Sequence, residues 1–334
     1  MSLIFIFLDG VGLAPAGPDN PLASAPLPAL QALLGGPLTL EQAASGRGAP
    51  RPGESPAPSA DHRSILLRAI DATLGVPGLP QSGTGQTALF AGFNAAALHG
   101  RHQPHFPPVA LRPLLAERSV FQRVGERGGR AAFANAFGDG YWQAVAARRI
   151  RRSASVIAAE GAGIRFRDEQ DLRAGLAVPW DITGAAMRRR GVSAPLLSPE
   201  AAGATLVRLA GDHQLVFFET FLPDLAGHGR WIADDADGAE QAADGDRRSA
   251  VEQIHAAMAR IDGLLGGVLA AMRPEDTLLV TSDHGNVESL SAPAHTRNPV
   301  PLLAVGPGAP LFAQVTSIAE VADVVEQAAL ASDV

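Results

Sequence analysis

The sequence of 334 residues predicts an α/β fold, a doubly wound and mostly parallel sheet flanked by helices. Two observations lead to this prediction. Several short runs are apolar on both faces, which is typical of parallel strands covered by helices on both sides. A longer segment between two of these runs has apolar residues spaced three and four apart, as in an amphipathic helix. Strands that alternate with helices in this way favour a doubly wound sheet.

The predicted strands are the runs LIFIFL, LVFFET, TLLVTS and VPLLAV, which begin at Leu3, Leu215, Thr277 and Val300. Each is apolar throughout and rich in β-branched or aromatic residues, so each is expected to lie inside a parallel sheet. The helix is predicted in RSAVEQIHAAMARIDGLLGGVLAAM, from Arg248, between the second and third strands. These elements form the framework of the predicted core.

A small cap is expected to interrupt this core. The segment from Glu117 to Phe137 has the pattern of a helix, a glycine turn and a strand, and so continues the core. Residues 138–198 break the pattern with arginine-rich stretches such as ARRIRRSASVI. We therefore predict a catalytic core made of residues 1–137 and 199–334, with residues 138–198 as an inserted cap.

Two polar stretches are predicted to be loops. Residues 43–59 are rich in proline, glycine, alanine and serine, which indicates a surface loop. Residues 233–248, ADDADGAEQAADGDRR, are acidic and are expected to form a solvated or mobile loop.

The composition limits the chemistry. The chain has no cysteine, so disulfides, thiolate nucleophiles and cysteine zinc sites are excluded, and histidines and carboxylates must hold any metal. All 27 basic residues are arginine and the net charge is −7, which disfavours a nucleic-acid partner.

The composition and the apolar segments indicate where in the cell the protein is expected to be. The absence of cysteine fits a reducing cytoplasm. The apolar start MSLIFIFLDG has no basic flank before it and no small-residue cleavage pattern after it, and no uninterrupted apolar run approaches the roughly 20 residues of a membrane span. We expect a soluble cytoplasmic protein with no membrane partner; the sequence carries no signal for its oligomeric state.

Acidic residues follow three of the predicted strands. Asp9 and Asp283 come directly after their strands, and Asp224 follows LVFFETFLP. Because ligands of open parallel sheets bind outside the carboxyl ends of the strands, these carboxylates are expected to be neighbours. An aspartate after a strand is often only a helix cap or turn residue, and the coincidence at three strands is what indicates a metal site.

Histidines accompany two of these acids. His228 lies four residues after Asp224, one helical turn away, so both side chains can face one point. His284 adjoins Asp283, and His295 precedes the next predicted strand. Three carboxylates and three imidazoles can hold two divalent ions, and this mixture of oxygen and nitrogen suits Mn²⁺ or Zn²⁺ more than Ca²⁺.

The segment GLPQSGTGQTALFAG, from Gly78, is the candidate source of a nucleophile. A glycine-rich turn leads there into an apolar helix, whose N-terminal amides favour an anionic phosphate. Ser82, Thr84 and Thr87 are the candidate hydroxyls, and a plain helix cap is the structural alternative.

Five motifs together resemble one known superfamily. FLDGVG, SGTGQ, PDLAGH, TSDHGNVE and AHTRNPVPLL are similar to motifs of the alkaline phosphatase superfamily, in particular the branch of cofactor-independent phosphoglycerate mutase and phosphopentomutase. The matches lie towards both ends of the chain. SGTGQ lacks the CxPxR-type pattern of the sulfatases in the superfamily.

The resemblance implies a two-metal site and a covalent intermediate. Ser82 would be the nucleophile that becomes phosphorylated, with Thr84 as second choice. The implied ligands of one ion are Asp9, Asp283, His284 and the nucleophile, and those of the other are Asp224, His228 and His295.

The chain also departs from that branch. The segment between Gly92 and Leu215 does not resemble the branch's substrate-binding domain, and no lysine is present. Arg149, Arg151 and Arg152 offer guanidinium groups for a substrate phosphate or carboxylate, although a solvated surface would show the same pattern.

These observations predict a two-metal phosphoryl-transfer enzyme for a small phosphomonoester. The short cap favours a phosphohydrolase, and a phosphomutase is the alternative. An alternative hypothesis from a different functional class is a non-catalytic metal- or nucleotide-binding α/β protein. Such a protein would be expected to lack a ligand or the nucleophile, and the chain also lacks the GxxxxGK motif of a P-loop.

Overall fold

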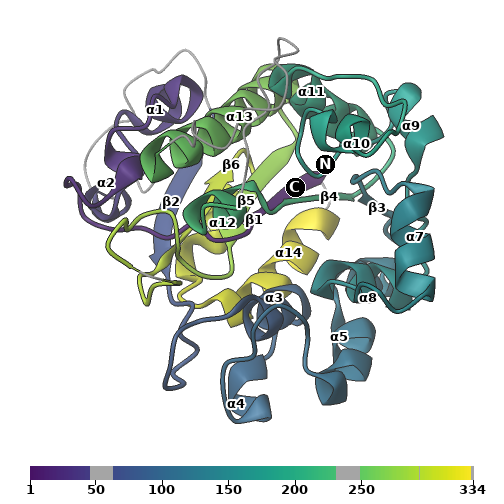
Figure 1. Cartoon of the computed structure of the whole chain (residues 1–334), viewed down its shortest axis with the longest axis horizontal. Helices are drawn as coiled ribbons and strands as arrows, with labels where there is room; N and C mark the ends of the chain where they lie inside the picture. Colours follow the sequence, from purple (N-terminus) through teal and green to yellow (C-terminus); the bar gives the residue numbers. More distant parts are fainter. Residues whose placement is uncertain (46–62, 231–248, 293, 332–334) are drawn as a thin grey trace.

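The computed structural model describes residues 1–45, 63–230, 249–292 and 294–331 (Figure 1). The predicted loop at residues 233–248 lies outside these ranges, as does most of the loop predicted at 43–59. The first two residues of the latter, Ala43 and Ala44, are helical instead, since they end α2 (Leu40–Ala44).

A six-stranded sheet in the order β2-β6-β5-β1-β4-β3 forms the centre of the molecule. The α/β class predicted from the sequence is confirmed. The strands are β1 (Leu3–Leu8), β2 (Ile65–Ile70), β3 (Ala131–Phe133), β4 (Leu215–Thr220), β5 (Thr277–Ser282) and β6 (Val300–Val305). β2, ILLRAI, was not predicted, because a charged side chain and partial exposure interrupt its apolar pattern.

The sheet is parallel except for one strand. β1 pairs in parallel with both β4 and β5, and β3 pairs in parallel with β4. β6 is antiparallel to both of its neighbours, β5 and β2, so the expectation of a parallel strand at Val300 is wrong. A parallel connection requires a crossover, usually a helix, whereas an antiparallel one needs only a turn or loop. No helix lies in the described part of residues 283–299.

Both faces of the sheet are covered by helices, which explains the unbroken apolar strands. In β1, Leu3, Phe5 and Phe7 enter one core cluster, while Ile4, Ile6 and Leu8 enter the other. Alternate side chains of a strand point to opposite faces, so both sets must be apolar. The antiparallel β6 is buried in the same way, which is why its composition does not reveal its direction.

Two helical layers enclose the sheet (Figure 1). One contains α1 (Pro28–Leu34), α2, α11 (Pro199–Ala210), α12 (Leu222–Gly227) and α13 (Ala250–Ala271). The other contains α3 (Ser82–Ala91), α4 (Ala95–His99), α5 (Arg112–Arg118), α6 (Val120–Glu126), α8 (Ala154–Gly161) and α14 (Val321–Leu330). Short 3₁₀ turns are η1 (Pro21–Ala23), η2 (Val109–Leu111), η3 (Ala309–Gln314) and η4 (Ile318–Glu320).

The segment predicted as a cap, residues 138–198, contains α7 (Asp139–Ala146), α8, α9 (Glu169–Arg173) and α10 (Ala185–Arg189). α8 packs on α3 and α5 within the main helical layer. Residues of α9 and α10 instead join a small separate cluster that includes Leu172 and Met187. The boundaries of a functional cap stay a prediction.

The long helix predicted from Arg248 corresponds to α13. Among the described residues it is the one helix long and apolar enough to cross a membrane. It packs against α11, and Ile254, Ile261 and Leu265 are buried in the core. Core helices of soluble proteins satisfy the same test, so this is weak evidence for a membrane span.

A buried carboxylate on α13 caps α1. Asp262 is 3% exposed, and its two oxygens accept the backbone N–H groups of Ala29 and Leu30 at 2.9 and 2.8 Å. The N-cap residue of α1, Leu27, makes no side-chain capping bond. Asp262 therefore supplies from a distant helix the capping oxygens that the first turn of α1 needs.

We predict that Asp262→Asn lowers the free energy of unfolding by about 1–3 kcal/mol, because an amide NH₂ would face one of these backbone donors. Urea denaturation of the two proteins measures the difference. Equal midpoints and slopes would show that the capping bonds do not contribute.

Candidate active site

The three predicted carboxylates lie at one edge of the sheet. Asp9 follows β1, Asp283 follows β5, and Asp224 lies in the first turn of α12, just after β4. These three strands are adjacent in the order β5-β1-β4, and they are parallel, so their carboxyl ends point to the same edge.

The first cluster of donor atoms surrounds His284. Its Nε2 lies 3.2 Å from Asp9 Oδ1 and 3.7 Å from Asp283 Oδ2. The hydroxyl of Ser82 is 3.0 Å from the same nitrogen. Asp9, Asp283 and His284 can offer ligand atoms that all lie close enough to hold one ion.

The second cluster lies beside the first. Asp224 Oδ1 is 3.3 Å from His228 Nε2 and 3.4 Å from His295 Nε2, and the two histidine nitrogens are 3.3 Å apart. The imidazoles of His284 and His295 are stacked, with ring centroids 3.7 Å apart. His284 can also be grouped with Asp224 and His295, so the two clusters are contiguous.

The direction of β6 brings His295 to this cluster. The loop that carries His295 precedes β6, and the amino end of an antiparallel strand lies at the edge where its parallel neighbours end. A parallel β6 would have begun at the opposite edge.

The donor atoms fit divalent cations. Both oxygens of Asp283 are buried and accept no hydrogen bond from the described residues. Buried carboxylate oxygens without partners are costly unless an ion or a proton satisfies them. Nitrogen ligands that hold Zn²⁺ tetrahedrally at about 2.0–2.1 Å lie roughly 3.3–3.4 Å apart. The spacing in the second cluster has this value.

The electrostatics of the site also favour cations. Burial raises the pKa of Asp283 to about 8, and the charge of Asp9 adds to this effect. Burial likewise raises the pKa of Asp9. Although burial opposes it, the negative charge of Asp283 and a hydrogen bond to Asp9 raise the pKa of His284 to about 10. Excess negative charge in a buried site is relieved when cations bind.

The pKa of Asp224 shifts in the opposite direction because neighbouring side chains donate hydrogen bonds to its carboxylate. Burial alone would raise the pKa of Asp224, but hydrogen bonds from His228 and His295 lower it below its ordinary value. Asn286 Nδ2 also donates to Asp224 Oδ1 at 2.7 Å. This carboxylate is therefore held ionised.

Of the three candidate hydroxyls, Ser82 contacts the cluster. It is the first residue of α3 and is 8% exposed. Thr84 Oγ1 accepts the N–H of Gln103 at 3.2 Å, and the hydroxyl of Thr87 donates to the carbonyl of Gly83 at 2.6 Å. Both threonine hydroxyls are thus bonded to backbone groups of the α3 turn and its neighbouring loop.

Several residues that orient the candidate ligands were not singled out from the sequence. Gln86, on α3, donates from Nε2 to Asp9 Oδ2 at 3.0 Å, which leaves Oδ1 facing His284. His295 Nδ1 donates to the carbonyl oxygen of Pro80 at 2.9 Å, and this bond orients the ring so that Nε2 faces Asp224. Gln86 lies within the SGTGQ motif, so the motif itself was the available signal.

Glu219 is a fourth buried acid near the site, and it was also missed. It occupies β4 and is 3% exposed, with Oε2 accepting no hydrogen bond from the described residues. Burial raises the pKa of Glu219 to about 8 despite a hydrogen bond from Ser155, and the charges of Asp9 and Asp283 contribute. A glutamate inside the apolar run LVFFET was the signal in the sequence.

The three arginines proposed for substrate lie in the turn between α7 and α8, and all are exposed. Arg151 stacks over the ring of Phe106 at 5.7 Å, and Arg152 pairs with Glu160 at 3.1 Å. Arg149 makes a backbone bond to Ala144. None of the contacts found for these residues joins them to the histidine cluster.

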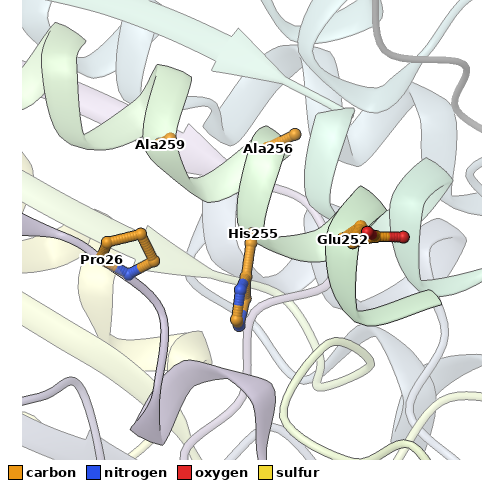
Figure 2. Close-up of a pocket in the computed structure, with 5 residues that line it drawn as sticks. All are labelled: Pro26, Glu252, His255, Ala256 and Ala259. Atoms are coloured by element: carbon orange, nitrogen blue, oxygen red, sulfur yellow. The ribbon is translucent and has the colours of Figure 1, made fainter. Parts of the chain in front are cut away.

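A hollow elsewhere on the surface does not coincide with this cluster. Pro26, Glu252, His255, Ala256 and Ala259 line it, along α13 (Figure 2). The imidazole of His255 is 3.0 Å from the carbonyl oxygen of Pro21. The hollow contains none of the candidate ligands, and we do not regard it as the active site.

Comparisons with known proteins agree with this geometry. A family model described as the metalloenzyme superfamily matches residues 243–330. The phosphopentomutase of Methylobacterium sp. (strain 4-46) is 51% identical over 53 residues, which are 16% of this chain and 13% of that protein. The 2,3-bisphosphoglycerate-independent phosphoglycerate mutase of Rhodopseudomonas palustris (strain ATCC BAA-98 / CGA009) is 34% identical over 128 residues, 36% of this chain and 21% of that protein.

The fold matches over nearly the whole chain. The cold-active alkaline phosphatase of the psychrophile Shewanella sp. has a TM-score of 0.51 and 13% identity, covering 98% of this chain and 99% of that one. The chain is therefore similar to an alkaline phosphatase in overall fold, and its sequence matches to the metalloenzyme family model and to the two mutases are partial. The sequence matches to the two mutases span about a fifth or less of the length of those relatives.

We predict a pH dependence of stability that arises from Glu219. Its pKa is about 8 in the folded protein and about 4.5 ordinarily, so its stabilising contribution is full below about 4.5 and is lost as the pH rises to about 8. Glu219→Gln, which cannot ionise, should therefore gain stability relative to wild type as the pH rises through this window.

Urea unfolding with a chelator present, at pH values on both sides of the window, measures this gain. Parallel pH profiles for the two proteins would contradict the prediction.

Proposed function

We propose that the protein is a phosphohydrolase for a small phosphomonoester and works through a phosphoserine at Ser82. The observation that carries the proposal is the position of the Ser82 hydroxyl, 3.0 Å from His284 Nε2 at the start of α3. A nucleophile there adjoins a cluster suited to cations and the N-terminal end of a helix, both of which favour a phosphate.

We propose that the chain holds two divalent ions, Mn²⁺ or Zn²⁺. The residues that would hold them are Asp9, Ser82, Asp283 and His284 for one, and Asp224, His228 and His295 for the other. Two such ions, when bound, stabilise the charges on the entering and leaving oxygens of a phosphoryl transfer.

In the first half-reaction, Ser82 Oγ forms a bond to phosphorus as the bond from phosphorus to the ester oxygen breaks. The serine proton is released, and the departing alkoxide takes up a proton to become the alcohol product. In the second half-reaction, water adds to phosphorus and the bond to Ser82 Oγ breaks, which regenerates serine and yields inorganic phosphate.

Arg151 is the first arginine to examine for substrate binding. It stacks over Phe106, and the carbonyl oxygen of Phe106 lies 2.3 Å from the position that a Cβ on Gly83 would occupy. This loop therefore packs directly against the residue that follows Ser82. We propose that Arg151, with Arg149 and Arg152 near it in sequence, contacts an anionic part of the substrate.

A phosphomutase is the second candidate, and the sequence matches to a phosphopentomutase and a phosphoglycerate mutase favour it. A mutase shares the first half-reaction but passes the phosphoryl group to a hydroxyl of the bound substrate. A non-catalytic metal- or nucleotide-binding protein would keep bound metal without turnover. We further propose a cytoplasmic location and no nucleic-acid or membrane partner, which the net charge of −7 supports.

The first test is hydrolysis of 4-nitrophenyl phosphate with Mn²⁺, Zn²⁺ or a chelator. We expect metal-dependent turnover that Ser82→Ala lowers by about a thousandfold or more, because the covalent route is lost. Thr84→Val is the matched control and should stay within about tenfold of wild type, since the Thr84 hydroxyl is bonded to backbone. Loss of turnover in the control alone would move the nucleophile to Thr84.

A second test separates hydrolase from mutase. The protein is incubated in ¹⁸O-labelled water with a pentose phosphate and with a phosphoglycerate, and products are analysed by mass spectrometry. A hydrolase releases inorganic phosphate that carries one solvent oxygen, whereas a mutase yields an isomeric ester without label. An isomeric ester without labelled inorganic phosphate would contradict the hydrolase proposal and support a phosphomutase.

A further inference from the structure

Glu288 is a fully buried carboxylate that contacts two loops around the site, the loop after β1 and both ends of the β5–β6 connection. We propose that Glu288 is the positioning residue that joins these loops into one unit and so sets the affinity of both metal sites. The inference rests on the proposed metal binding, and it concerns a residue that is not itself a candidate ligand.

One oxygen of Glu288 binds backbone donors of two loops. Oε2 accepts the N–H of Gly12 at 2.9 Å and the N–H of Asn286 at 2.8 Å. Gly12 lies in the loop that follows β1 and carries Asp9. Asn286 lies in the turn that follows β5 and carries Asp283 and His284.

The other oxygen binds side chains near the far end of the β5–β6 connection. Oε1 accepts the hydroxyl of Thr296 and the Nδ2 of Asn298, the latter at 3.1 Å. Thr296 directly follows His295, so this pair of bonds holds the loop that leads into β6. One carboxylate is therefore bonded to the loop of Asp9 and to both ends of the β5–β6 connection, which carry Asp283 and His295.

Asn286 extends this connection to Asp224. Its backbone N–H binds Glu288, while its side chain donates to Asp224 Oδ1 at 2.7 Å. Glu288 is thus linked, through at most one intervening residue, to loops that carry ligands of both proposed ions.

Two glycines, Gly12 and Gly285, lie against the carboxyl group of Glu288. A Cβ on Gly12 would lie 2.3 Å from Glu288 Cδ, and a Cβ on Gly285 would lie 2.2 Å from Oε1. A larger residue at either glycine would therefore displace the carboxylate or the loop. Two glycines thus admit the carboxylate where the ligand loops converge.

The chemistry of the four contacts requires a carboxylate. All four partners are donors, and a carboxylate offers only acceptor positions. In Glu288→Gln an NH₂ group would replace one oxygen at nearly unchanged volume. It would lose the bonds from Gly12 and Asn286 if it stood at Oε2, and the bond from Asn298 if it stood at Oε1. Because outer-shell partners fix the orientation of metal ligands, the loss should appear in metal affinity.

The test measures Zn²⁺ binding to chelator-stripped protein by calorimetric titration, at a temperature where circular dichroism shows each variant folded. Glu288→Gln should raise the Zn²⁺ Kd of both sites by roughly 10–100-fold. Asp262→Asn is the matched control: it also turns a buried carboxylate into an amide that faces backbone N–H groups, but on α13. It should lower the Tm and leave both Kd values within about twofold.

The outcomes separate this inference from the proposed function. A wild-type protein that binds no Zn²⁺ would overturn the metal site itself. Zn²⁺ binding that is equal in wild type and Glu288→Gln would overturn only the role of Glu288. Equal weakening by Asp262→Asn would also overturn it, because the effect would then be one of general stability.

Thr296 provides a milder variant if Glu288→Gln does not fold. Thr296→Val removes one donor to Glu288 at similar volume and should weaken Zn²⁺ binding by less than Glu288→Gln does. Thr296→Ser keeps the hydroxyl and should restore the wild-type Kd. Wild-type affinity in Thr296→Val would overturn the inference.

Discussion

The repulsion among Asp9, Asp224 and Asp283 is the constraint on which the site depends. A parallel sheet brings the ends of adjacent strands together, and here each end carries a carboxylate beside an apolar core. Burial raises the pKa of Asp283 to about 8, whereas hydrogen bonds from two histidines lower the pKa of Asp224. Negative charge that is only partly balanced by imidazoles is an arrangement that divalent cations complete.

The surrounding fold keeps this charge in place. Gln86 holds one oxygen of Asp9, and Asn286 holds one oxygen of Asp224, so each carboxylate presents a defined atom to the clusters. Gln86 lies on the same helix as Ser82, one turn further along. The candidate nucleophile and one candidate ligand, Asp9, are therefore positioned by the same short, fully buried helix.

The region above the sheet gives less information about the substrate. The turn that carries Arg151 touches the nucleophile turn through Phe106, whereas Arg152 is paired with Glu160 on α8. α8 packs with the main helical layer, while α9 and α10 share a small core of their own. One fold can host many functions through the sites built on it, so the chemistry at the strand ends does not by itself define the substrate.

The sequence by itself determined most of the strands and the candidate ligands at their ends. Apolar runs followed by Asp9 and Asp283, and the one-turn spacing of Asp224 and His228, are local patterns that depend only on the periods of strand and helix. The tertiary structure decided what depends on distant residues. The antiparallel direction of β6 is invisible in a strand that is buried on both faces, yet it brings His295 to the site. Glu288 likewise joins its own β5–β6 connection to Gly12, which is 276 residues away in the chain, and no local spacing encodes that contact.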